Sequence, residues 1–151
     1  FLEKNFHQQV YFPGRFEKLE NNKLNKLISD QNELYLDGSH NSDAAANINE
    51  SLQSLPKKKL CIVIGMLNTK NPKDYINQFS DIESIHTINI PNEENSLSAL
   101  TLKNSIQDIC QNTFDCENIE IAIKDIVSKN SDARILICGS LYLVGQVLKN
   151  N

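Results

Sequence analysis

Short apolar runs alternate with amphipathic segments along most of this chain, and this alternation constrains the fold more than any other feature of the sequence. Runs typical of buried strands lie at residues 34–36, 60–64, 84–90 and 134–138. Between and after them, apolar residues recur every three or four positions, which is the period of a helix packed on one side. Strands that alternate with helices form βαβ units. The sequence therefore predicts an α/β fold: a Rossmann-like, doubly wound, mostly parallel sheet of about five or six strands flanked by helices.

The expected helices follow these strands in order along the chain. One begins near Asn41 and ends before Pro56, a short one carries residues 75–79, two more span 98–111 and 117–129, and the last begins at Ser140. The stretch before the first regular strand is harder to interpret. Residues 16–19 and 24–28 predict two short strands or one hairpin, with Asn21 and Asn22 as the turn.

The chain has the size and composition of one globular domain. Its 151 residues are 40% apolar and 23% charged, which is enough to bury a continuous core. It begins at Phe1 without an initiator methionine, so we expect a piece of a longer protein. We expect residues 1–15 to be a linker from a preceding domain and residues 16–151 to form the globular domain.

Charge and cysteine usage exclude several classes of function. The net charge of −4 and the isoelectric point near 5.3 disfavour a nucleic-acid partner, because nucleic-acid binders usually present a basic face. The four cysteines contain no CxxC pair, so the sequence predicts neither a zinc site nor a disulfide framework. No apolar segment approaches the roughly 20 residues of a membrane span. We therefore expect a cytoplasmic protein that binds neither nucleic acid nor membranes.

Three predicted strand-to-helix junctions combine glycine with polar residues. They are Asp37-Gly38-Ser39-His40-Asn41, the stretch from Gly65 to Lys70, and Cys138-Gly139-Ser140. In a parallel sheet these junctions line one edge, where doubly wound folds bind ligands. A carboxylate, an imidazole, a lysine and a hydroxyl would meet there beside helix amino termini, which favour anions. The set suits a nucleotide or an amino-acid carboxylate.

Each of these residues also has a purely structural interpretation. Asp37-Gly38 is a common turn, and Asn41, Ser42 or Ser140 is a routine helix cap. Arg15 alone is an ordinary solvated surface residue, and His7 and His86 are interpreted as structural or incidental. The chain contains neither G-x-G-x-x-G nor G-x-x-x-x-G-K-[ST], so this domain is not expected to cradle a triphosphate alone.

Four elements in sequence order resemble the carboxy-terminal domain of the folylpolyglutamate and dihydrofolate synthases, a branch of the Mur ligase family. They are Phe12-Pro13-Gly14-Arg15, Asp37-Gly38-Ser39-His40-Asn41, Gly65-Met66-Leu67 with Lys70, and Gly139-Ser140-Leu141-Tyr142-Leu143. The family has W/F-P-G-R, D-G-A-H-N, G-M-L…K and G-S-L-Y-L at these places. The resemblance extends over about residues 12–148. One such element alone carries little weight, but four in order are specific.

The resemblance implies a domain that closes over a separate amino-terminal P-loop ATPase domain and is inactive alone. In the implied reaction, ATP phosphorylates the carboxylate of dihydropteroate or a folate, and the amine of L-glutamate displaces the phosphate. Arg15 would contact the nucleotide phosphates and Asp37 the ribose. His40 and Ser140 would hold the incoming glutamate, with Asn41 and Lys70 as further candidates.

The same resemblance implies positioning rather than acid–base or nucleophilic chemistry in this domain. ATP and Mg²⁺ would be bound mainly by the missing domain, no metal ligand is expected here, and the protein is expected to be a monomer. Ser39 and Ser42 depart from the family's alanine and proline, and residues 68–71 lack the aspartates that flank the lysine in many relatives. Two alternatives stay open: the equivalent domain of a peptidoglycan-precursor ligase, and a non-catalytic nucleotide- or anion-binding module.

Overall fold

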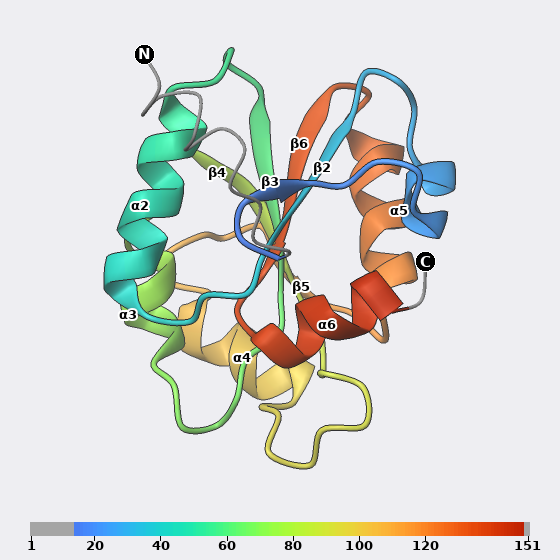
Figure 1. Cartoon of the computed structure of the whole chain (residues 1–151). Helices are drawn as coiled ribbons and strands as arrows, with labels where there is room; N and C mark the ends of the chain where they lie inside the picture. The colour runs from blue at the N-terminus through green and yellow to red at the C-terminus, as the bar shows by residue number, and fades with distance from the viewer. Residues whose placement is uncertain (1–13, 150–151) are drawn as a thin grey trace, which may run out of the picture.

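A computed structural model describes residues 14–149 of the chain (Figure 1). The strands are β1 (Glu17–Lys18), β2 (Glu33–Asp37), β3 (Lys59–Ile64), β4 (Ile82–Thr87), β5 (Thr113–Asp115) and β6 (Ala133–Cys138). The helices are the 3-10 helix η1 (Lys23–Leu27), α2 (Ser42–Gln53), α3 (Pro72–Ile76), α4 (Ala99–Ile106), α5 (Ile119–Lys129) and α6 (Leu141–Lys149). Phe12 and Pro13 of the first family element lie outside the described residues.

The six strands form one sheet in the order β1-β2-β6-β3-β4-β5. Only β1, at the edge, runs antiparallel to its neighbour, and the other pairs are parallel. This arrangement confirms the predicted α/β fold with a mostly parallel, six-stranded sheet.

Helices cover both faces of the sheet, so each inner strand is buried on both sides (Figure 1). Side chains alternate between the faces along a strand. In β3, Cys61 and Val63 pack towards η1, α5 and α6, whereas Ile62 and Ile64 pack towards α2, α3 and α4. This double burial explains why the central strands are continuous apolar runs in the sequence.

Two sequence predictions were wrong in detail. Residues 24–28 form no strand: Lys23–Leu27 is a 3-10 helix, begun by a reciprocal cap in which the Asn22 side chain accepts from Leu24 N–H and the Asn25 side chain accepts from Asn22 N–H. The predicted helix 98–111 ends at Ile106, and the chain that follows supplies the short strand β5, which the sequence analysis missed. No helix among residues 14–149 has the length and apolar character of a membrane span.

Candidate functional site

The three polar junctions lie side by side at the carboxyl edge of the sheet, as predicted. Strand register places Cys138, the last residue of β6, opposite both Asp37 of β2 and Ile64 of β3. Gly139, which follows β6, has a φ of +106°, and a Cβ there would lie 2.4 Å from the carbonyl oxygen of Gly65. Only glycine permits this backbone approach, which brings two of the junctions into contact.

Asp37 fastens two turns to each other through its carboxylate. Its Oδ1 accepts a hydrogen bond from the N–H of Ser39, and its Oδ2 accepts one from the N–H of Phe16, both at 2.8 Å. The N–H of Gly38 also donates to the carbonyl oxygen of Gly14, at 2.7 Å. The turn that carries Arg15 is thereby held against the turn that carries Asp37, although 21 residues separate Phe16 from Asp37.

Phe16 adopts a strained backbone conformation at this contact. Its φ of +41° lies in the left-handed region, which is unusual for a bulky residue. Such strain costs about 1–3 kcal/mol and persists only where the surroundings impose it. Here the hydrogen bond to Asp37 and the stacking of the Phe16 ring on Tyr35, with ring centroids 4.8 Å apart, impose it. The strained residue, Phe16, directly follows Arg15 in the chain.

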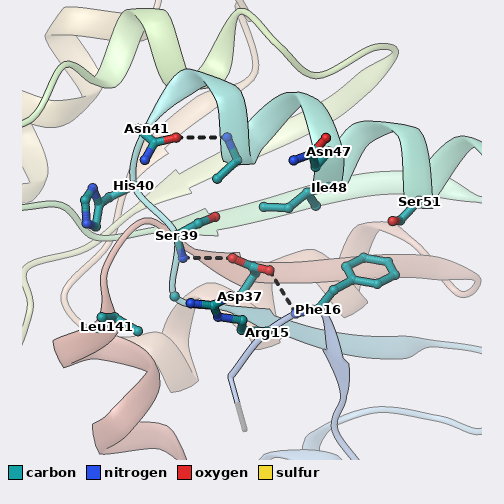
Figure 2. Close-up of a pocket in the computed structure, with 12 residues that line it drawn as sticks. Arg15, Phe16, Asp37, Ser39, His40, Asn41, Asn47, Ile48, Ser51 and Leu141 are labelled. Atoms are coloured by element: carbon teal, nitrogen blue, oxygen red, sulfur yellow. Dashed lines mark hydrogen bonds between the residues drawn. The ribbon is translucent and has the colours of Figure 1, made fainter. Parts of the chain in front are cut away.

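A pocket of about 380 Å³ lies between these turns and one side of α2. Figure 2 shows it running from His40 and Leu141, past Asp37 and Arg15, to Phe16 and Ser51. Ala44, Asn47, Ile48 and Ser51 line it from α2 at helical spacing. Asp37 is 94% buried, but a carboxylate has about four acceptor positions, so two backbone bonds leave room for ligand hydroxyls.

A second, smaller cavity of about 100 Å³ adjoins the first. It is lined by His40, Leu67, Lys70, Gly139, Ser140, Leu141 and Tyr142. Lys70 forms no ion pair with any other residue in the described range, so its ammonium is available to an anion. The cavity therefore offers a cation, an imidazole and a helix start to a carboxylate.

His40 and Leu141 line both the pocket and the cavity. The Nδ1 of His40 is buried and has no hydrogen-bond partner within residues 14–149. A buried polar atom without a partner costs about 1–3 kcal/mol, so a ligand that donates to it or accepts from it would recover that energy. His40 is thus the polar group that connects the two binding spaces.

Ser140 and Asn41 carry the structural roles that the sequence also allowed. Ser140 is buried, its Oγ accepts from the N–H of Tyr142 at 3.0 Å, and its carbonyl accepts from Val144, so it begins α6. Asn41 caps α2, because its Oδ1 accepts from the N–H of Ala44 at 2.9 Å. Both still border the site: Asn41 lines the pocket and Ser140 lines the cavity.

Ser39 stands where the family has alanine, and its hydroxyl is buried. The Ser39 Oγ and the hydroxyl of Tyr75 on α3 are both buried beneath the turn. Burial raises the pKa of Tyr75 well above its usual range, with smaller effects from nearby Cys138 and Ser39. Burial likewise raises the pKa of the Cys138 thiol to about 12, so both groups are neutral at physiological pH.

His86 is structural, in agreement with the sequence interpretation. It is buried on β4, and its Nε2 lies 2.7 Å from Oδ2 of Asp125 on α5. It lines neither the pocket nor the cavity. His7, the remaining histidine, lies outside the described residues.

The sequence analysis missed Phe16, Asn47, Ser51 and Leu141 as residues of the site. The α2 residues were detectable in principle, because 44, 47, 48 and 51 form one helical face next to Asn41. Phe16 gave no such signal, since an apolar residue beside a polar motif usually belongs to the core. Leu141 was singled out only as a member of a family element, without a role at the site.

Comparison with known proteins supports the observed fold and identifies the family of the chain. A family model for the C-terminal domain of dihydrofolate synthetase matches residues 20–150. Solved structures of the same fold include folylpolyglutamate synthase from Thermotoga maritima (25% identity, TM-score 0.72) and E. coli FolC in complex with DHPP and ADP (21%, 0.74). A third is Mycobacterium tuberculosis folylpolyglutamate synthase complexed with ADP (18%, 0.76).

These structural matches cover 93–94% of this chain but only 31–32% of the solved chains, so it spans about a third of their length. No curated protein sequence matches it at a significant level. The family match over residues 20–150, on a fold shared with folylpolyglutamate synthases, confirms the resemblance found in the motifs. This chain belongs to the family of dihydrofolate synthetase C-terminal domains.

Proposed function

We propose that this domain is the glutamate- and nucleotide-positioning part of an ATP-dependent ligase that adds L-glutamate to dihydropteroate or folates. The observation that carries the proposal is the adjacency of two binding spaces that share His40 and Leu141. One has the size and polar groups for a nucleotide, and the other has a cation and a helix start for a carboxylate.

In the larger pocket, Arg15 would contact the nucleotide phosphates and Asp37 the ribose hydroxyls. The phosphates would point to the end formed by His40 and Leu141, and the base to the end formed by Phe16 and Ser51. In the smaller cavity, Lys70 and His40 would bind a carboxylate of glutamate, beside Ser140 at the start of α6. Asn41, whose Oδ1 is occupied by its cap bond, would contribute only its amide N–H₂.

The proposed reaction has two steps. A carboxylate oxygen of the acceptor attacks the γ-phosphorus of ATP, and ADP leaves with the electrons of the broken P–O bond. The glutamate amine then attacks the acyl carbon, phosphate departs, and the amine loses a proton as the amide forms. The described residues supply orientation and charge stabilisation, which are the main sources of catalysis in phosphoryl transfer.

Other parts of the ligase would lie in a preceding P-loop ATPase domain. Within residues 14–149 no group of three or more His, Cys, Asp or Glu residues is placed to hold a metal ion. Mg²⁺ is usually bound through one or two carboxylates and substrate phosphates. We propose that ATP and Mg²⁺ are bound mainly by that domain, that residues 1–15 link to it, and that the present domain is inactive alone. A monomer in the cytoplasm fits these roles.

Incorporation of labelled L-glutamate by the full-length protein tests the proposal. We expect ATP-dependent incorporation into dihydropteroate, a folate or both, and a loss of at least about a hundredfold in His40→Ala, since two substrate contacts converge on that ring. Asp43→Asn, an exposed change on α2 outside the pocket, is the control and should retain full activity. Absence of incorporation with either acceptor, or a fully active His40→Ala variant, would refute the assignment.

A further inference from the structure

We propose that the amino edge of the sheet holds a second binding site, built around the buried Arg134, for a small carboxylic acid with a hydrocarbon body. The site lies at the opposite edge of the sheet from the two binding spaces described above. The inference therefore goes beyond the proposed function and does not depend on it.

Arg134 is a buried arginine whose hydrogen-bonding capacity is only partly used. It is the second residue of β6, and only 4% of its surface is exposed. Its Nε donates to Oε1 of Glu33 at 2.8 Å, whereas its two Nη groups donate to no residue within 14–149. A guanidinium carries five N–H donors, so four of them lack an acceptor from this part of the chain. Since buried polar groups nearly always have partners, these donors point to a ligand.

Arg134 lines a pocket of about 230 Å³ at the amino ends of the strands, at the top of Figure 1. Strand register explains the position, since Arg134 lies opposite both Glu33 of β2 and Leu60 of β3. The other lining residues come from the end of α2, the segment up to the start of β3, and the turn before β4: Leu52, Gln53, Leu55, Lys57, Lys58, Leu60, Ser80 and Asp81. None of these residues lines either binding space at the carboxyl edge.

The charges at this pocket favour a carboxylate. Lys58 is already paired with Asp132, but Lys57 is exposed and forms no ion pair within the described part of the chain. An incoming carboxylate would therefore meet the Nη groups of Arg134 and the ammonium of Lys57. The planar fork of arginine matches the two oxygens of a carboxylate, which makes this pairing directional as well as electrostatic.

Three leucines give the pocket an apolar wall. Leu52 and Leu60 are buried, and the partly buried Leu55 packs against the same core cluster. A hydrocarbon body lying on this wall would lose its contact with water, which an inorganic anion such as phosphate cannot do. A volume of 230 Å³ corresponds to roughly eight waters of liquid, so the acid must be small.

Two sources share this chemistry, and Asp81 distinguishes them. Asp81 lines the pocket, is exposed, and forms no ion pair within residues 14–149. Its carboxylate repels a simple carboxylic acid but attracts the ammonium group of an amino acid with an aliphatic side chain. The ligand is thus either a short-chain carboxylic acid or an aliphatic amino acid, and the two are separated by whether the amino group improves binding.

Titration calorimetry of the full-length protein with isocaproate, L-leucine and inorganic phosphate tests the site. The two organic acids have the same hydrocarbon body and differ in the amino group. We expect at least one of them to bind with a Kd below about 1 mM, and phosphate to bind about tenfold more weakly or worse. Tighter binding of L-leucine identifies the amino acid, and tighter binding of isocaproate identifies the simple acid; either result supports the site.

Variants locate the binding. Arg134→Lys keeps a cation beside Glu33 but removes the fork, and should weaken binding of the organic acid about tenfold. Lys57→Met, at an exposed position, should weaken it about two- to fivefold. Lys124→Met, an exposed lysine on α5, and Lys70→Met, at the carboxyl edge, are the controls and should bind the acid as wild type does.

No saturable binding of either organic acid by the wild type would overturn the inference. So would binding that is unchanged in both Arg134→Lys and Lys57→Met, binding that is lost in Lys70→Met, or phosphate binding as tight as that of the acids. Thermal unfolding verifies that each variant is folded, and Lys57→Met decides if Arg134→Lys is not. A wild type that incorporates glutamate but binds neither acid refutes only this site, whereas one that binds an acid but incorporates no glutamate refutes only the proposed function.

Discussion

At the scale of single residues, Asp37 combines a structural role with the nucleotide contact that we propose for it. Its two oxygens each accept one backbone N–H, from Phe16 and Ser39, and so join the turn of Arg15 to the start of α2. Asp37 also lines the larger pocket. A substitution at Asp37 is therefore expected to affect stability as well as nucleotide binding, which a purely ligand-binding carboxylate would not do.

Asp37→Asn tests this double task, because one of the two carboxylate acceptors becomes an N–H₂ group that cannot accept. We expect the free energy of unfolding to fall by about 1–3 kcal/mol, the usual cost of leaving a buried polar group unpaired. Urea unfolding of the domain measures it, with Asp43→Asn as the control that stays within about 0.5 kcal/mol of wild type. Equal stability of the two variants would contradict the proposed clamp.

The sequence indicates the polar residues that line the two binding spaces, but it does not indicate which residues they contact. Glycine and helix-capping residues obey local rules, so the turn at Gly38 and the caps at Asn41 and Ser140 were foreseeable. The contact between Asp37 and Phe16 joins residues far apart in the chain, and no local pattern encodes it. The same holds for Leu141, whose place depends on how closely α6 approaches Gly38.

At the scale of elements, the errors of sequence interpretation fall on short segments. The central strands β3 and β6 are buried on both faces and therefore produce long apolar runs. β5 has three residues and η1 has five, too few for a period to be distinguished. In η1 the reciprocal cap formed by Asn22 and Asn25 stabilises a helix. In the sequence, these asparagines resemble turn residues.

The start of α2 allows capping to be separated from ligand binding at Asn41. Asn41→Ser keeps an N-cap acceptor, whereas Asn41→Ala removes it and should destabilise the domain by about 1 kcal/mol. If the amide also contacts a ligand, both variants lose activity but only Asn41→Ala loses stability. Chemical unfolding and glutamate incorporation, measured on both variants, distinguish the roles; equal stability of the two variants would show that the cap is unimportant.

The pair His86 and Asp125 connects β4 to α5 and makes the stability of the fold depend on pH. Burial lowers the pKa of His86 below the 6.5 of an exposed histidine, and the nearby Asp125 offsets this only in part. Burial tends to raise the pKa of Asp125, but hydrogen bonds from His86 and Lys129 outweigh it and lower that pKa. The folded protein thus binds a proton on His86 less readily than the unfolded chain does.

The sign of the effect follows from linkage. Stability contributed by neutral His86 is complete above pH 6.5 and is lost as the pH falls from there towards the lower pKa of the folded state. In His86→Gln, which has no titrating group at this position, the loss between pH 7.5 and 5.5 should be smaller than in wild type. Urea unfolding at the two pH values measures it, and an unchanged loss would assign the pH dependence to other groups.

At the scale of the whole molecule, the domain presents two binding spaces on one edge of a rigid sheet. The sheet register brings the three junctions together, and helices pack against both faces of the sheet. The chain spans about a third of the solved folylpolyglutamate synthases that share its fold. In the reaction that we propose, catalysis would begin only when a separate nucleotide-binding domain brings the γ-phosphate and the acceptor to the edge where His40 and Leu141 lie.

The central claim is that the larger pocket binds ATP and the smaller cavity binds glutamate. Steady-state kinetics of Arg15→Gln and Lys70→Met in the full-length protein test this claim most directly. Loss of one charged hydrogen bond is worth about 1.5–3 kcal/mol, or roughly ten- to a hundredfold in KM. We predict that Arg15→Gln raises the KM for ATP by this factor and leaves the KM for glutamate unchanged. Lys70→Met should raise the KM for glutamate and leave the KM for ATP unchanged. Lys124→Met, at an exposed position, is the control and should change neither KM. A rise in both KM values in each variant, or in neither, would contradict the account.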